Sequence, residues 1–297
     1  MRFLVSCVHI MKSAPLLRTL LVLGRMADLP TVWSNCLAGW WLGGGGNYWK
    51  LPFLLLGVSA LYTGGAFLND AFDADSDRQR RPERPIPAGK ISAQLVWQIG
   101  FGQLVAGIFL LLFCSQLSAG AAILLALFIL LYNFSHKFFN AAPWLLGACR
   151  FWIYVIAGAA GAWGLNGWPI LGGIALAFYV AGLGYPGRRE SYRRQLPFLP
   201  LRLLAAPVLL ALAMNTGSFR LRAVWVAFGL VAWTGWCARK VFLGGGNLAL
   251  IGSNLFAGIV FVDWLAVAPQ IPLWPSVPVF LALFGLTKWL QKFAPAA

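Results

Sequence analysis

The sequence predicts an all-α membrane protein, a polytopic transmembrane helical bundle of nine or ten spans. Of the 297 residues, 60% are hydrophobic and only 10% are charged, and the mean hydropathy is +0.75. A soluble globular chain carries roughly 25% charged residues. Because no water-surrounded core of this length hides so many apolar side chains, the surroundings of most of the chain are predicted to be lipid.

Apolar runs of about 20 residues, the length that an α-helix needs to cross a bilayer, recur along the chain and are bounded by Gly, Pro, Asn or charged residues. The run at 248–267 contains Asp263, so it is either a span or a broken or interfacial segment, and the count is therefore nine or ten. The predicted spans are 28–45, 51–68, 94–115, 118–134, 143–163, 168–186, 198–215, 221–238, 248–267 and 273–291.

The basic residues indicate the topology, because cytoplasmic loops hold an excess of Lys and Arg. With the N-terminus inside, only Lys50, Arg220 and Arg222 of the 23 Lys and Arg residues fall on the outer side. We therefore expect an integral protein of the bacterial inner (cytoplasmic) membrane whose functional loops face the cytoplasm. The net charge of +15 then reflects membrane topology and excludes a nucleic-acid partner.

Residues 1–27 form a separate N-terminal interfacial segment in this interpretation, and residues 28–297 form one transmembrane domain. Within the first segment, leucines accompany Arg18 and Arg25, which is typical of an amphipathic helix at a membrane surface. The five cysteines stand singly without a C-x-x-C pair, so the sequence predicts neither a disulfide framework nor a zinc site.

The acidic residues are concentrated at the end of the second predicted span. Five of the eight Asp and Glu residues lie between positions 70 and 83, although a carboxylate at membrane depth costs about 3 kcal/mol. If the helix continues through this segment, about 100° per residue places Asp70, Asp73 and Asp77 on one face, with Asn69 at its edge. Asp75 falls on the opposite side.

Three carboxylates on one face repel one another unless a cation lies between them. All-oxygen ligation fits Mg²⁺ best, and Mg²⁺ with few protein ligands takes its other oxygens from water and substrate phosphate. Four arginines follow, and their planar guanidinium groups match phosphate oxygens; they are Arg78, Arg80, Arg81 and Arg84. The segment therefore predicts a diphosphate site. The alternative is a solvated loop whose charges pair only with each other.

At these residues the chain resembles the UbiA superfamily of intramembrane prenyltransferases, whose first signature has the form N-D-x-x-D-x-x-x-D followed by arginines. Here residues 69–77 read NDAFDADSD and residues 78–92 read RQRRPERPIPAGKIS. Weaker similarity covers residues 24–39, GRMADLPTVWSNCLAG, and residues 131–137, LYNFSHK. The resemblance implies a helical bundle with a central cavity open to lipid, in which aspartates bind Mg²⁺ and the metal holds an isoprenoid diphosphate.

The function that the resemblance implies is Mg²⁺-dependent transfer of an isoprenoid group from a prenyl diphosphate donor to a lipid-soluble or aromatic acceptor within the membrane. The donor's C–O bond ionises to release pyrophosphate, and the hydrophobic acceptor attacks the allylic cation; metal-bound charge stabilises the leaving group. The implied metal-binding and catalytic residues are Asp70, Asp73 and Asp77, and the implied diphosphate neighbours are Asn69, Arg81 and Arg84.

The second signature of the superfamily departs from its pattern in this chain. Residues 184–196 read GYPGRRESYRRQL, without aspartates, which resembles a divergent branch of the EboC type. Arg188 and Arg189 are predicted either to contact the diphosphate directly, with fixed charge in place of a second metal, or to be part of a positive-inside loop. The alternative function is a non-catalytic prenyl-lipid binding protein in a biosynthetic pathway.

Four further residues are candidates with open alternatives. Arg150, inside the fifth predicted span, is a substrate-binding candidate or snorkels to the headgroups. Lys137 either reaches the diphosphate or anchors the interface. Asp28 is interpreted as a helix-start residue rather than a catalyst, and Asp263 has no assigned role. A transporter is the rival class, but its repeated halves and broken helices are not evident.

Overall fold

The computed structural model describes residues 15–185, 199–242 and 248–292, and every regular element in these ranges is helical. The elements are α2 (Pro15–Leu23), the 3-10 turn η1 (Met26–Asp28), α3 (Leu29–Leu42), α4 (Lys50–Arg80), α5 (Ala93–Leu112), α6 (Gln116–Ser135), α7 (Ala142–Ala160), α8 (Gly167–Gly184), α10 (Leu199–Met214), α11 (Gly217–Phe242), α12 (Leu248–Ala257), α13 (Ile259–Val267) and α14 (Leu273–Leu290).

The prediction of an all-α polytopic bundle is confirmed. Each predicted span coincides with a helix, except that 248–267 is divided into α12 and α13 at Gly258. Six helices, namely α4 to α8 and α14, are long and apolar enough to cross a membrane, and shorter apolar helices accompany them within the described residues. The predicted lipid-open cavity stays a prediction: the pocket that we describe is a small one between α8, α10 and α13, away from the acidic motif.

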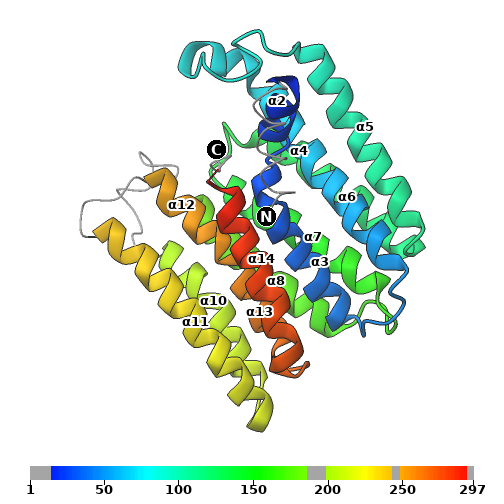
Figure 1. Cartoon of the computed structure of the whole chain (residues 1–297), viewed down its shortest axis with the longest axis vertical. Helices are drawn as coiled ribbons and strands as arrows, with labels where there is room; N and C mark the ends of the chain where they lie inside the picture. The colour runs from blue at the N-terminus through cyan, green and yellow to red at the C-terminus, as the bar shows by residue number, and fades with distance from the viewer. Residues whose placement is uncertain (1–14, 186–198, 243–247, 293–297) are drawn as a thin grey trace, which may run out of the picture.

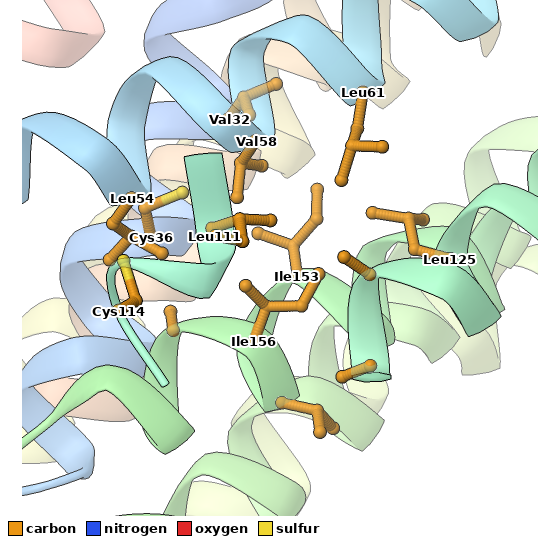
Figure 2. Close-up of a cluster of buried hydrophobic side chains, with 14 of the residues drawn as sticks. Val32, Cys36, Leu54, Val58, Leu61, Leu111, Cys114, Leu125, Ile153 and Ile156 are labelled. Carbon is orange, nitrogen blue, oxygen red and sulfur yellow. The ribbon is translucent and has the colours of Figure 1, made fainter. Parts of the chain in front are cut away.

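Figure 1 shows α4, α5 and α6 on one flank of the bundle and α10 and α11 on the other, with α3, α7, α8, α13 and α14 between them. One buried apolar cluster lies where α3 to α7 meet, and Figure 2 shows its side chains, among them Val58, Leu111 and Ile153, pointing toward one another. A second cluster fills the space between α8, α11, α13 and α14. Trp41 of α3 packs against both clusters.

Helix α4 is longer than the bilayer requires. Its 31 residues extend about 46 Å at ~1.5 Å per residue, whereas the hydrocarbon core is about 30 Å thick. The predicted second span, 51–68, is therefore the apolar part of a helix that continues to Arg80. Its last turns, which carry the acidic motif, project toward the membrane surface, and we call this side of the bundle the motif end.

Helices α4 and α5 pack closely through glycines that recur every seven residues on each helix. A Cβ added at Gly64 of α4 would lie 2.9 Å from the carbonyl oxygen of Gly100 on α5, and one added at Gly107 of α5 would lie 2.7 Å from that of Gly57 on α4. Small residues let membrane helices approach at backbone distance. The α4–α5 contact therefore holds the helix that carries the acidic motif.

Gly107→Ala should lower the free energy of unfolding by about 1–3 kcal/mol, because the added methyl group meets the backbone of α4. Gly102, on the same helix, has no atom within 4 Å of an added Cβ, so Gly102→Ala should be neutral or stabilise by up to about 1 kcal/mol through helix propensity. Unfolding of both variants in detergent micelles measures the difference, and equal stabilities would contradict the packing argument.

Candidate active site

Two aspartates of the acidic motif share one arginine. Asp70 and Asp77 are seven residues apart on α4, about two turns, so their side chains lie on the same face. The Nη1 atom of Arg84 lies 2.9 Å from Asp70 Oδ1 and 3.1 Å from Asp77 Oδ2. Both carboxylates are largely buried, with side-chain exposures of 14% and 11%. The pair therefore forms a cradle for a single cation.

The loop after α4 fixes Arg84 over this cradle. Its backbone is ordered by hydrogen bonds from Arg84 N to the carbonyl of Arg81 and from Ala88 N to the carbonyl of Arg84, at 3.1 and 2.9 Å. Ile86 and Ile91 of the loop are buried against apolar residues of α4 and α5. The apolar packing thus anchors a loop whose composition is otherwise highly charged.

The third motif aspartate faces a different helix. Asp73 Oδ1 lies 2.8 Å from Lys137 Nζ and 3.3 Å from His136 Nε2, both at the end of α6. Lys137 also donates to Ser76 Oγ at 3.0 Å and to the carbonyl of Phe72 at 3.3 Å. Lys137 is therefore brought to the acidic motif across 61 to 65 residues of sequence, and the charges of α4 and α6 meet there.

Asp75 and Arg81 are among the exposed charged residues of the segment that lie away from this cluster. Asp75 has a side-chain exposure of 93% and pairs with Arg78 at 3.2 Å, so the prediction that it lies opposite the other three aspartates is confirmed. The side chain of Arg81 is exposed, and within the described residues no ion pair joins it to the motif. Arg188 and Arg189, the other predicted phosphate contacts, lie outside the described residues.

The carboxylate oxygens of the motif are suitable ligands for a hard cation, but they do not form a complete metal site by themselves. Within the ranges that the structure describes, no three His, Cys, Asp or Glu side chains gather as a ready metal site. The two carboxylates of Asp70 and Asp77 already converge on one cationic nitrogen, and carboxylate oxygens are the ligands that Mg²⁺ prefers. Since Mg²⁺ commonly takes only one or two protein carboxylates and completes its shell with water and phosphate, these residues fit the ion.

Asn69 connects the motif to the start of the bundle. Its Oδ1 accepts from Arg25 Nη2 at 2.7 Å, and its Nδ2 donates to Asn133 Oδ1 at 3.2 Å. Arg25, between α2 and η1, has φ 48°, a left-handed conformation that costs a non-glycine residue about 1 kcal/mol. Strain of this kind persists where the surroundings hold it in place, here through the contact with Asn69.

Arg150 of α7 lies deeper in the bundle and does not snorkel to the headgroups. Only 3% of the residue is exposed. Its Nη1 donates to Asn35 Oδ1 at 2.6 Å and its Nη2 to Thr31 Oγ1 at 3.2 Å, while its guanidinium carbon lies 5.2 Å from the ring centroids of both Tyr62 and Phe256. The cation is thus held by polar groups of α3 and by two aromatic faces.

Asp263, which had no role in the sequence interpretation, is completely buried on α13. Its Oδ2 accepts from Ser34 and, at 2.7 Å, from Asn35 Nδ2, and its Oδ1 accepts from Tyr154 at 2.7 Å. Asn35 therefore joins Asp263 to Arg150 through its two side-chain atoms. This polar network links α3, α7 and α13. The apolar pattern of the sequence does not indicate that these three helices, rather than others, are joined by polar contacts.

Comparison with known proteins identifies the fold and the family. The model of the UbiA prenyltransferase family matches residues 29–204, more than half of the 297 residues, and the match includes the whole acidic motif. The chain belongs to the UbiA prenyltransferase family.

Curated relatives of this UbiA family member are matched over part of their length. The chain is 38% identical over 117 residues to digeranylgeranylglyceryl phosphate synthase of Methanoregula boonei, and this match covers 37% of this chain and 40% of that protein. It is 31% identical over 136 residues to 4-hydroxybenzoate octaprenyltransferase of Marinobacter nauticus, and this match covers 45% of each protein. The chain thus spans less than half the length of these two relatives.

Solved structures of UbiA homologues share the fold. The apo structure of the Aeropyrum pernix homologue superposes with a TM-score of 0.64 at 16% identity and covers 82% of this chain and 97% of that one. The Archaeoglobus fulgidus homologue bound to GPP and Mg²⁺ superposes with a TM-score of 0.51 at 15% identity and covers 92% and 99%. At these identities the likeness shows the fold alone.

Sequence reasoning missed the roles of Arg25 and Asp263 in this UbiA family member. A signal for each was present: Arg25 lies in the weakly similar segment 24–39, and Asp263 is the only acid between Glu190 and the end of the chain. The partners were not visible, because Asp263 and Ser34 are 229 residues apart. The predicted Asn69, Asp70, Asp73, Asp77, Arg84 and Lys137 are gathered at the motif end.

Asp263→Ala should lower the free energy of unfolding by about 3 kcal/mol, because three buried donors, those of Ser34, Asn35 and Tyr154, lose their shared hydrogen-bond acceptor. Asp75→Ala, which removes an exposed carboxylate, should change it by less than about 0.5 kcal/mol. The midpoints of chemical unfolding in micelles report both values. An Asp263→Ala protein as stable as Asp75→Ala would show that the network does not stabilise the bundle.

Proposed function

We propose that this protein transfers an isoprenoid group from a prenyl diphosphate to a lipid-soluble or aromatic acceptor within the membrane, with Mg²⁺ as cofactor. The observation that carries the proposal is the carboxylate cradle of Asp70 and Asp77, flanked by the cations of Arg84 and Lys137. The names of the relatives support it, as do the GPP and Mg²⁺ in the Archaeoglobus fulgidus homologue.

The residues of the motif end divide between the metal and the diphosphate. Asp70 and Asp77 would hold Mg²⁺, which when bound supplies Lewis-acid stabilisation of the leaving pyrophosphate. Asp73, whose carboxylate faces Lys137, stays a predicted third ligand that would have to turn from α6 toward the cradle. Arg84 and Lys137 would bind the diphosphate and stabilise the charge that develops on it, since both are fixed before the reaction by their contacts with the motif. Such preorganised cations would also retain the pyrophosphate away from the apolar interior.

The other predicted site residues are assigned roles around the metal and the diphosphate. Asn69 would orient the motif through Arg25 and would contact the diphosphate. Arg150, whose contacts lie among α3 and aromatic rings, is assigned to the acceptor side of the site. Arg81, Arg188 and Arg189 stay predicted phosphate contacts, on the strength of their sequence positions alone.

The proposal also includes the membrane in which the protein lies and its orientation there. Six helices long enough to span a membrane support an integral membrane protein. We propose the bacterial inner membrane with the motif end facing the cytoplasm. Support comes from the basic residues, of which only Lys50, Arg220 and Arg222 are predicted on the opposite side.

A second function is favoured by one specific observation. The segment 184–196 lacks the aspartates of the family's second signature, and without them the donor-binding site has a single acidic motif. A protein that binds a prenyl diphosphate without cleaving it would keep Arg84, Lys137 and the cradle. The two functions differ in whether pyrophosphate is released.

Asp77→Asn should reduce Mg²⁺-dependent pyrophosphate release from geranyl diphosphate at least about 100-fold, because it removes half of the cation cradle. Asp75→Asn is the matched control on the same helix and should keep wild-type activity, since its side chain is exposed. Purified protein in lipid nanodiscs is assayed with 4-hydroxybenzoate, with 1-O-hexadecylglycerol and without added acceptor. Binding of geranyl diphosphate without release under every condition would establish the binding function instead.

A further inference from the structure

We infer that Asp28 and Tyr62 form the acceptor site of this protein, where Asp28 takes the proton from a hydroxyl group of the acceptor. The inference rests on the proposed function and specifies the acceptor's chemistry: a lipid-soluble molecule that presents a neutral hydroxyl. It assigns a role to a residue that sequence reasoning interpreted as the start of a helix.

Asp28 occupies the N-cap position of α3 but does not cap it. Its side chain accepts no hydrogen bond from the first turn of the helix, and a proline stands at the N1 or N2 position, where a capping acceptor finds one backbone N–H fewer. The carboxylate is instead turned into the bundle, where only 4% of the residue is exposed. The local role that usually explains an aspartate here is therefore absent.

One oxygen of this buried carboxylate has no partner among the described residues. Asp28 Oδ2 accepts from the hydroxyl of Tyr62 at 3.4 Å, at the long end of the hydrogen-bond range, whereas Oδ1 has no hydrogen bond. A buried polar atom without a partner is costly and rare in native proteins. Asp263, buried to the same degree, accepts three hydrogen bonds, so burial alone does not account for the free oxygen of Asp28.

Two guanidinium groups stabilise the charge of Asp28 without occupying that oxygen. Arg25 precedes it by three residues and is bound to Asn69, and Arg150 on the other side is bound to Asn35 and Thr31. Within the described residues neither arginine lies within ion-pair distance of Asp28. A buried carboxylate that lies near two cations and has one oxygen without a partner is suited to accept a proton or a hydrogen bond from a ligand.

The location of Asp28 matches the place where an acceptor meets the donor. Arg25 and Asn69 hold the start of α3 against the acidic motif at 2.7 Å, where the diphosphate would bind. Tyr62 lies seven residues before Asn69 on α4, about 10 Å deeper along the helix. Because Arg25 contacts Asn69 and Asp28 contacts Tyr62, the segment from Arg25 to Asp28 runs alongside this stretch of α4. Tyr62 is itself fixed by the contact of its ring with Arg150.

The proposed reaction at this position is transfer of the prenyl group to the hydroxyl oxygen of the acceptor. The bond between C1 of the donor and the diphosphate oxygen breaks, and its electron pair leaves with pyrophosphate. The acceptor's hydroxyl oxygen forms a new bond to C1, and its proton passes to Oδ1 of Asp28. Release of that proton to pyrophosphate or solvent restores the carboxylate. A positioned general base contributes about 10²- to 10⁴-fold to such a step.

The test compares Asp28→Asn with the wild type in nanodiscs with geranyl diphosphate and Mg²⁺. The acceptors are 1-O-hexadecylglycerol, its dimethyl ether without a free hydroxyl, 4-hydroxybenzoate, and water alone. We expect the wild type to prefer a hydroxyl-bearing acceptor over the ether. Asp28→Asn should lower the transfer rate at least about 100-fold with unchanged affinity for geranyl diphosphate, because the donor binds at the acidic motif.

Tyr62→Phe provides the second variant, since it keeps the ring over Arg150 and removes only the hydroxyl that holds Asp28. It should fold even if Asp28→Asn does not, and it should lower the transfer rate about tenfold through the loss of one hydrogen bond to a charged group. Asp263→Ala is the structural control: it should reduce thermal stability while the folded fraction retains its preference for hydroxyl acceptors.

The outcomes separate the two proposals. If the wild type transfers the prenyl group and Asp28→Asn and Tyr62→Phe stay within threefold of it, the acceptor site is overturned and the prenyltransferase function stands. A wild type that accepts the dimethyl ether as readily as the alcohol also overturns the acceptor site. If the wild type binds geranyl diphosphate but releases no pyrophosphate with any acceptor or with water, the proposed function fails, and the inference fails with it.

Discussion

The structure depends on pairing carboxylates with cations where little water is available. Ionised groups inside a bilayer protein persist only with partners, and the motif end supplies them in two sets: Arg84 between Asp70 and Asp77, and Lys137 beside Asp73. Neither set is formed by one helix alone. The arrangement of α4, α6 and the loop after α4 is therefore tied to the electrostatics of the site. The proposed metal and diphosphate would exchange with contacts that already exist.

Apolar packing holds in place the helix and the loop that carry these charges. The glycines of α4 and α5 let the backbones of the two helices touch, and Ile86 and Ile91 fasten the charged loop onto the same pair of helices. An added methyl group in such packing lowers the stability of the protein. The precision of the cradle thus comes from residues without any chemistry of their own, which is a general route to a preorganised polar site.

A second layer of polar residues lies below the motif and joins parts of the chain that are distant in sequence. Asp263 is satisfied by three donors, while Asp28 is buried with one oxygen free. This contrast between two buried carboxylates in one bundle supports a structural role for Asp263 and the proposed acceptor role for Asp28. It also explains how the same helix, α3, stabilises the fold through Asn35 and serves the proposed acceptor site through Asp28.

The sequence by itself determined the all-helical membrane fold, the approximate positions of the helices and the face of α4 that carries Asp70, Asp73 and Asp77, because hydropathy and the 100° helical repeat are local properties. Only the tertiary structure decided that Asp73 turns toward α6, that Arg150 stays buried, and that Asp263 completes a network with α3 and α7. Those outcomes depend on contacts between residues 61 to 229 positions apart. Such contacts follow from how the helices pack, and no local pattern in the chain encodes them.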